Sequence, residues 1–372
     1  MKLQVLSEYL QKKLPFVFKA ISSRTQLPVL QNMLLQARNG KLQISGTDLE
    51  IGITVYITAN IEEEGEVTIP AKSFLELVNT LPLEKVTLET KDQTLIIVTK
   101  NTKSVFQTIT ADEFPKLYEE KGQEVAKLNK KDLQKALSYV LFAASIDTTR
   151  AALSGIYVKK DEEDEKKFFF VTTDGYRLSL KYNTIPFRIE KPLLISARVL
   201  KEVMMLKNGE DENIKIFMIE KSNQVLFEDG DTIIVGRLIE AQFPVYEKII
   251  PQEVLTKATF DRVDLVKAVK MCSIFARESA NIVKFSVTQD AIIVSANAPQ
   301  TGENTVTVEA KVTGDDNEIA FNARYLLELL GTIEEEEMVV EMTNPTSPGV
   351  FKIKGDPTFL HLIMPIRVQT EV

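Results

Sequence analysis

Two carboxylates stand at matching places in the chain, and their residue type could carry out acid–base chemistry. Asp48 follows Thr47 and Asp174 follows Thr173, so the two aspartates are 126 residues apart. Paired carboxylates hydrolyse glycosidic bonds in many enzymes. Here the corresponding place later in the chain holds Asn297 instead of an acid. Equivalent positions of separate repeats are not expected to meet on one substrate, and the alternative role for each aspartate is to form a turn.

Other catalytic constellations are missing from the sequence. The chain has one histidine, His361, and one cysteine, Cys272, so it lacks the residues for a site with two histidines or a cysteine cluster. It also lacks a P-loop, an HExxH zinc motif and a dinucleotide-binding fingerprint. We therefore predict no catalytic residues, no metal site and no cofactor.

A basic residue recurs at three equally spaced positions. Lys72, Arg198 and Arg324 each follow an alanine, at 126-residue intervals. Cationic side chains bind the phosphates of nucleic acids, and such contacts carry no sequence information. For any one base, a solvated helix face is the simpler interpretation, but the recurrence favours a shared contact with nucleic acid. The net charge of −8 argues against a uniformly basic surface and still permits a local basic face.

The segments that carry these bases predict three helices in three copies of one domain. Residues 69–78, 195–204 and 321–330 share an apolar pattern at i, i+3 and i+4, which is one face of a helix. A period of 126 residues is too long for a solenoid unit and is typical of a whole domain. We predict domains at 1–125, 126–253 and 254–372.

Each copy is expected to hold a further helix and about eight short strands. The apolar stretch from Val5 to Leu14 predicts a helix that Pro15 breaks or kinks, and Asp261 is expected to begin another helix. Asn39-Gly40 indicates a tight hairpin, and residues 358–367 a final strand. Lysines, among them Lys130, are expected off the apolar helix faces. The fold class is α+β, with each helix pair packed on antiparallel sheets.

The cellular location of the protein is predicted from the signal peptide and the membrane-spanning run that its sequence lacks. The N-terminal residues do not resemble a signal peptide, and no apolar run approaches the ~20 residues that span a bilayer. The single cysteine fits a reducing compartment. We predict a cytoplasmic protein that does not associate with membranes.

Four stretches resemble the bacterial sliding clamp family, the beta subunits of DNA polymerase III. They are Arg-Thr-Gln-Leu-Pro-Val-Leu at 24–30, Thr-Asp-Gly-Tyr-Arg-Leu at 173–178, Gln-Phe-Pro-Val-Tyr at 242–246 and Met-Pro-Ile-Arg at 364–367. The resemblance implies a non-catalytic processivity factor, a homodimer whose six domains form a ring around double-stranded DNA. It also implies three kinds of partner: the polymerase III alpha subunit, a clamp loader complex, and other DNA polymerases and repair proteins with clamp-binding peptides.

The resemblance also assigns site residues. The partner-peptide pocket is expected between the second and third domains, from Leu153, Thr173, Gly175, Tyr176, Arg177, Leu178, Pro244, Lys248, Ile249, Leu362, Met364, Pro365, Ile366 and Arg367. Contacts with DNA are expected from Arg24, Lys72, Arg150, Arg198 and Arg324. The dimer interface is expected to pair Phe106 with the helix that carries Cys272, Ile274 and Phe275. Tyr176 stands where many members of the family have His, and residues 369–372 extend beyond the usual end.

Two rival hypotheses remain open at this point. One is an enzyme that uses Asp48 and Asp174. The other is a repeat scaffold that binds peptides but never DNA, which would be distinguished by whether the recurring bases face a common channel.

Overall fold

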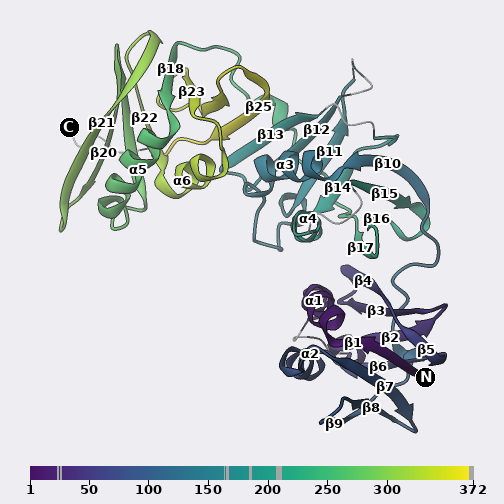
Figure 1. Cartoon of the computed structure of the whole chain (residues 1–372). Coiled ribbons are helices and arrows are strands. Elements are labelled where there is room, and N and C mark those ends of the chain that lie inside the picture. The colour runs from purple at the N-terminus through teal and green to yellow at the C-terminus, as the bar shows by residue number, and fades with distance from the viewer. Residues whose placement is uncertain are drawn as a thin grey trace. The chain divides into compact units, whose positions relative to one another are not determined.

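Antiparallel β-sheets with a few helices make up the chain (Figure 1). The computed structural model describes residues 1–22, 25, 27–162, 164, 167–183, 187–206 and 212–367. These residues form six α-helices and 25 strands, which confirms the predicted α+β class. Within these ranges, no helix is long and apolar enough to cross a bilayer.

The repeated helix is present in all three copies. It forms α2 (Ala71–Thr80), α4 (Ala197–Met204) and α6 (Ala323–Thr332), each of which begins at the predicted alanine. The apolar positions of the motif are buried, as shown by Phe74, Val203 and Leu326. The 126-residue period therefore corresponds to a repeated structural element.

The first of two compact units contains Met1–Lys130 and Lys201–Leu238. Helix α1 (Ser7–Phe18) packs against α2 and strand β4 (Figure 1). One sheet has the order β5 (Asn60–Glu63), β1 (Lys2–Leu6), β7 (Lys85–Lys91), β8 (Thr94–Val98), β9 (Lys103–Gln107). The other has the order β10 (Gln123–Asn129), β15 (Asn213–Ile219), β16 (Gln224–Asp229), β17 (Thr232–Arg237), β4 (Ile51–Thr58), β3 (Lys41–Thr47), β2 (Asn32–Arg38), β6 (Gly65–Pro70).

The second unit contains Lys131–Leu200 and Ile239–Val372. Helix α5 (Arg262–Ala276) packs against α6, and α3 (Lys130–Leu141) falls almost wholly in this unit. Its strands form one sheet in the order β14 (Leu193–Ser196), β11 (Gly155–Lys160), β12 (Phe168–Thr173), β13 (Arg177–Asn183), β25 (Asp356–Ile363), β24 (Gly349–Ile353), β23 (Glu337–Met342), β18 (Thr256–Asp261), β21 (Gly302–Gly314), β20 (Ala291–Ala298), β19 (Ile282–Thr288), β22 (Asn317–Asn322). The pairing of β13 with β25 joins a strand of the second copy to the last strand of the third.

Local predictions have mixed outcomes. Asn39 and Gly40 have φ of 51° and 72°, as a tight β2–β3 hairpin requires, and the Asp261 side chain caps α5. The helix predicted from Val5 to Leu14 forms as α1, but its bounds were wrong, because Val5 lies in β1 and the helix continues through Pro15 to Phe18. The final strand also ends earlier than predicted, at Ile363, two residues before a proline that has no N–H to donate to a ladder.

Candidate partner groove and nucleic-acid interface

The turn between β12 and β13 is built by two side chains. The Thr173 hydroxyl donates to the Arg177 carbonyl at 2.6 Å and accepts from the Gly175 N–H at 3.0 Å. Asp174 Oδ1 accepts from the N–H groups of Tyr176 at 2.9 Å and of Arg177 at 3.1 Å. Gly175 has a φ of +94°, which favours glycine. These bonds hold Tyr176 at the tip of a rigid turn.

The same bonds recur 126 residues earlier. Thr47 donates to the Ile51 carbonyl at 2.8 Å, and Asp48 Oδ1 accepts from the N–H groups of Glu50 and Ile51 at 3.1 and 3.0 Å. Both aspartates therefore form turns, which removes the observation behind the enzyme hypothesis. Within the described residues, no group of three or more His, Cys, Asp and Glu side chains could hold a metal ion.

The Met-Pro-Ile-Arg segment lies beside this turn. Leu178 pairs with Leu362 across β13 and β25, and the N–H of Met364 donates to the Tyr176 carbonyl at 2.8 Å. Two residues on, the N–H of Ile366 donates to the Ala320 carbonyl at 2.8 Å. The segment after β25 is thus tied to a turn of the second copy and to strand β22 of the third.

A buried apolar cluster underlies these exposed side chains. Leu178 and Leu362 share it with Phe243 and Tyr246, and the ring of Phe243 stacks on Tyr157 at a centroid distance of 4.7 Å. Three large apolar residues close in sequence to this cluster are exposed: Tyr176 by 60%, Ile249 by 41% and Met364 by 36%. Large apolar side chains exposed around a buried floor are typical of a peptide-binding surface. We use the name partner groove for Tyr176, Ile249 and Met364 together with this buried cluster, as the candidate site.

The predicted pocket residues fall into three groups: buried, half-buried and exposed. Five are buried: Leu153, Thr173, Arg177, Leu178 and Leu362. Pro365 and Ile366 are half-buried. The remaining residues are exposed: Gly175, Tyr176, Pro244, Lys248, Ile249, Met364 and Arg367. Val245, 59% exposed beside Pro244, was missed, although it lies inside the 242–246 motif.

Arg177 lies behind the groove and not on its wall. Its side chain is 6% exposed, and its guanidinium pairs with Asp174 at 3.0 Å and with Glu328 at 2.6 Å. It also donates to the Phe142 carbonyl at 2.7 Å and lies 4.6 Å from the ring centre of Tyr325. These contacts hold Arg177 against the turn, and its place in the partner-peptide pocket stays a prediction.

Glu328 is a charged neighbour of this turn that the repeat pattern marks in the sequence. It occupies the same place in its copy as Glu76 and Glu202 do in theirs. Burial opposes ionisation of Glu328, but hydrogen bonds from Arg324 and Arg177 outweigh it and hold the pKa of the carboxyl below its usual value. Glu328 is therefore a charged link between two arginines.

The recurring bases are exposed at the start of their helices. Lys72, Arg198 and Arg324 are the second residues of α2, α4 and α6, and all three are exposed. The Arg324 Nε donates to Glu328 at 2.7 Å. The guanidinium of Arg150 lies over the turn, because a Cβ atom on Gly175 would be 3.5 Å from its Nη1. Arg150 is therefore also a neighbour of the partner groove, and Arg24 lies outside the described residues.

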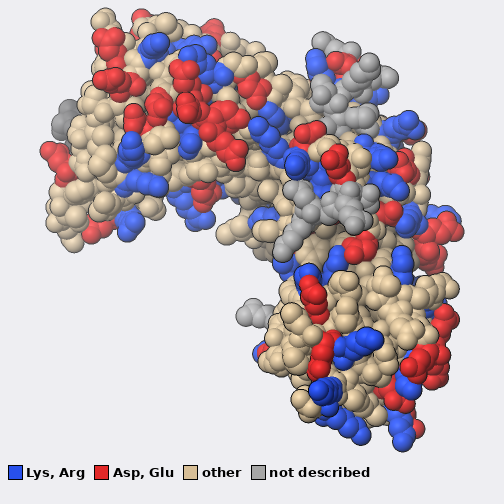
Figure 2. All heavy atoms as spheres, viewed as in Figure 1, with Lys and Arg blue, Asp and Glu red and all other residues tan. Residues whose placement is uncertain are grey.

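Lysines of the first helices are mostly engaged in pairs. Lys130 was expected on the solvated face, but it is 1% exposed and pairs with Asp229 at 2.6 Å. Lys12 pairs with Glu8 and Lys267 with Asp264 on their own helices. Figure 2 shows basic and acidic side chains interspersed on the visible face, with acidic groups gathered near β5. Any basic face is therefore local.

The residues predicted for the dimer interface differ in accessibility. Phe106 is half-buried on β9, which is an edge strand of its sheet. Ile274 is 58% exposed on α5, whereas Phe275 packs against the core of the third copy. Cys272 is fully buried, and its Sγ lies 3.3 Å from the Val294 carbonyl. The prediction that Cys272 meets a partner subunit is corrected, because its helix position faces the core.

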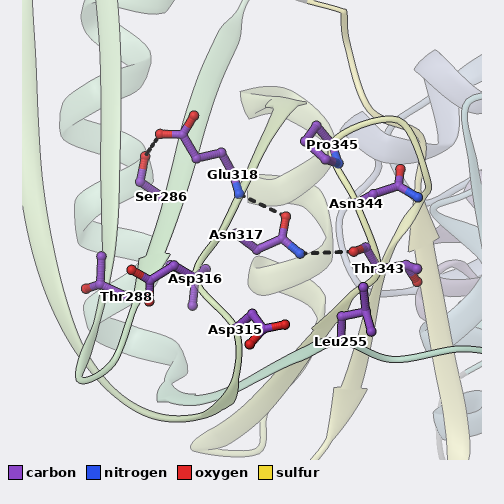
Figure 3. A pocket seen from close by; sticks show the side chains of 11 residues that line it. Leu255, Ser286, Thr288, Asp315, Asp316, Asn317, Glu318, Thr343, Asn344 and Pro345 are labelled. Carbon is purple, nitrogen blue, oxygen red and sulfur yellow. Dashed lines mark hydrogen bonds between the residues drawn. The ribbon is translucent and has the colours of Figure 1, made fainter.

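A separate polar pocket of about 500 Å³ lies in the third copy (Figure 3). Its lining residues bond to one another: Asn317 donates to the Thr343 carbonyl at 3.3 Å, and Ser286 donates to Glu318 at 3.0 Å. None of the predicted site residues lines it. These bonds join neighbouring loops, so the pocket has a structural explanation.

Comparison with known proteins covers the whole chain. Models of the N-terminal, central and C-terminal domains of the DNA polymerase III beta subunit match residues 1–118, 127–245 and 247–367. The beta sliding clamp of Synechococcus elongatus is 30% identical over 100% of both chains. The domain boundaries proposed from the sequence stay a prediction.

Solved structures agree with this result. The DNA polymerase sliding clamp of Bacillus subtilis is 26% identical, with a TM-score of 0.93 over 99% of each chain. The beta sliding clamp of C. crescentus is 28% identical, also with a TM-score of 0.93, over 99% of this chain and 100% of the other. The chain therefore belongs to the DNA polymerase III beta subunit family, the sliding clamps, which are non-catalytic processivity factors of DNA polymerase.

Proposed function

We propose that the chain forms a head-to-tail homodimer that closes around double-stranded DNA and slides along it. Membership of the clamp family over the full length supports this proposal. A sliding ring needs weak contacts with phosphates and no reading of bases, because each phosphate contact adds salt-dependent affinity. A net charge of −8, with bases recurring at matching helix starts, satisfies both requirements.

The partner groove is proposed to hold the proteins that the clamp tethers. They are the DNA polymerase III alpha subunit, the clamp loader complex, and other polymerases and repair proteins that carry clamp-binding peptides. The observation that supports this role is the exposure of Tyr176, Ile249 and Met364, which are close in sequence to members of a buried apolar cluster. A flexible methionine at such a surface adapts to several ligands. The C. crescentus clamp was solved with polyethylene glycol bound to its proposed beta-motif tethering region.

The dimer interface is proposed to join β9 of one subunit to α5 of the other. Phe106 on the edge strand and the exposed Ile274 on α5 are the side chains available for such an interface. An edge strand has unpaired backbone groups that a second chain can use. We further propose that the dimer acts in the cytoplasm, as its composition indicates.

Light scattering tests the homodimer. We expect wild-type protein to have twice the chain mass of 41.9 kDa and Ile274→Asp protein to have the mass of a single chain. Val263→Asp is the matched control, because Val263 is also an exposed apolar residue of α5, and it should leave the dimer intact. A wild-type monomer at micromolar concentration would refute the ring.

A further inference from the structure

A second, smaller pocket lies where α5 ends and α6 begins. It has a volume of about 270 Å³ and is lined by Ser273, Arg277, Asn281, Ala323, Arg324, Leu327 and Glu328. Two guanidinium groups and one carboxylate leave a formal excess of one positive charge. No ion pair of Arg277 is found among the described residues, and its side chain is exposed where it lines the pocket. Planar guanidinium groups suit the oxygens of a phosphate.

Glu328 connects this pocket with the interior. One carboxylate oxygen accepts from the Arg324 Nε at 2.7 Å, and the other lies 2.6 Å from the Arg177 Nη1. Arg324 is exposed, whereas Arg177 is buried. An anion in the pocket can therefore compete with Glu328 for Arg324, but it cannot reach Arg177 without displacing packed side chains.

Arg177 contacts Glu328 on one side and the turn that holds Tyr176 on the other. Its Nε donates to Asp174 Oδ2 at 3.0 Å, and the other oxygen of Asp174 holds the N–H of Tyr176 at 2.9 Å. The Tyr176 carbonyl accepts from the N–H of Met364 at 2.8 Å. Unbroken polar contacts thus join the pocket to two of the three exposed groove residues.

We propose that this pocket binds a phosphate group of the DNA backbone and that its occupancy strengthens peptide binding in the partner groove through Glu328 and Arg177. When a phosphate takes Arg324, both Glu328 oxygens are left to Arg177. The Asp174 turn is then held more tightly, and a peptide loses less conformational freedom in ordering it. The coupling and the identification of the phosphate as that of DNA rest on the proposed function, whereas the binding of phosphate itself does not.

Linkage requires the effect to be reciprocal. A peptide in the groove should raise the affinity of the pocket for phosphate by the same factor, and typical couplings between sites are about 5-fold or more. A clamp on DNA would then hold its partners more tightly than a clamp free in solution.

The test uses the full-length dimer labelled with ¹³C at its methionine methyl groups. The Met364 resonance, assigned with a Met364→Leu variant, is followed while inorganic phosphate or a 20-base-pair duplex is added. Phosphate binding itself is measured by broadening of the ³¹P line. We expect a saturable shift of Met364 with both probes, and about a 5-fold rise in the affinity of a labelled peptide with an aliphatic and an aromatic anchor.

Three variants separate the steps. Arg277→Ala with Arg324→Ala should abolish ³¹P broadening and the Met364 shift. Glu328→Gln should keep the broadening and lose the shift. Arg188→Ala with Lys191→Ala removes the same charge from exposed residues outside the pocket and should change neither.

Each contrary outcome has a distinct meaning. Broadening that persists in the double arginine variant would overturn the phosphate site. Broadening without a Met364 shift in wild-type protein would overturn the coupling. A shift with inorganic phosphate but not with duplex would identify a site for free phosphate and overturn the DNA proposal. Loss of peptide binding to wild-type protein under all conditions would instead refute the groove, and the ³¹P result would still decide the pocket.

Discussion

Acid should destabilise the second unit through its buried histidine. His361 is fully buried, its Nδ1 shares a 2.6 Å hydrogen bond with Ser179 Oγ, and its ring stacks on Phe142 at 5.1 Å. Its Nε2 has no hydrogen-bond partner among the described residues. Burial, with a smaller effect from the nearby charge of Arg177, holds the pKa of His361 well below its ordinary value of 6.5.

The sign and size of the effect follow from proton linkage. The folded pKa is depressed, so below pH 6.5 the unfolded chain binds a proton that the folded chain does not. Stability is complete above that pH and falls by about 1.4 kcal/mol per pH unit below it, until the folded pKa is reached. Each pH unit of that fall corresponds to roughly 3–6 °C in the melting temperature of a unit of this size.

Scanning calorimetry on wild-type and His361→Gln protein tests this effect cleanly, because the chain has no other histidine. Glutamine retains a group that can bond to Ser179 but does not titrate. The difference between the two melting temperatures should change with pH from 6.5 to 5.0, while carboxylates contribute equally to both proteins. Parallel curves over that range would refute the buried, neutral state of His361.

Three further predictions concern single side chains. Arg177→Met should destabilise the second unit by about 3 kcal/mol, because it leaves partners of a buried guanidinium unpaired. Arg324→Met removes an exposed ion pair to the same Glu328 and should cost about 0–1 kcal/mol. Equal losses in calorimetry would contradict this difference. Met364→Glu should reduce the affinity for a clamp-binding peptide at least tenfold in fluorescence anisotropy. Arg367→Glu, at an exposed neighbouring residue, should have a smaller effect. An unchanged affinity of the Met364→Glu protein would show that Met364 does not bind the peptide. Cys272 should resist thiol reagents in the folded protein and react once it is unfolded, because burial raises the pKa of its thiol to about 11; rapid labelling of the native dimer would show that α5 exposes this face.

The sequence predicted the repeated elements better than the contacts between them. The alanines at 71, 197 and 323 identified the starts of α2, α4 and α6, because an apolar face at i, i+3 and i+4 is a local pattern. The bases after them were exposed as expected. The equivalence of Thr47-Asp48 and Thr173-Asp174 extends to individual hydrogen bonds.

The errors arose where tertiary contacts decide. Val5 fits a helical pattern, yet it lies in β1, which pairs with β5 and β7. Lys130 was placed in solvent because its partner, Asp229, is 99 residues away in the sequence. Local sequence also gave no sign that Glu328, Asp174 and Phe142 hold the Arg177 side chain. Local periodicity contains no information on such pairs.

Retention on DNA tests the central claim most directly. The protein would be incubated with nicked circular DNA, a bacterial clamp loader and ATP, isolated with the DNA in high salt, and the circle then cut once with a restriction enzyme. The clamp assignment predicts that the protein stays on closed circles in high salt and leaves after linearisation, because it is held by topology. The control is a known clamp that loads in parallel, and light scattering must show that this chain is a dimer. If the protein then never stays on circles, even with a clamp loader from its own source, the result contradicts a ring around DNA.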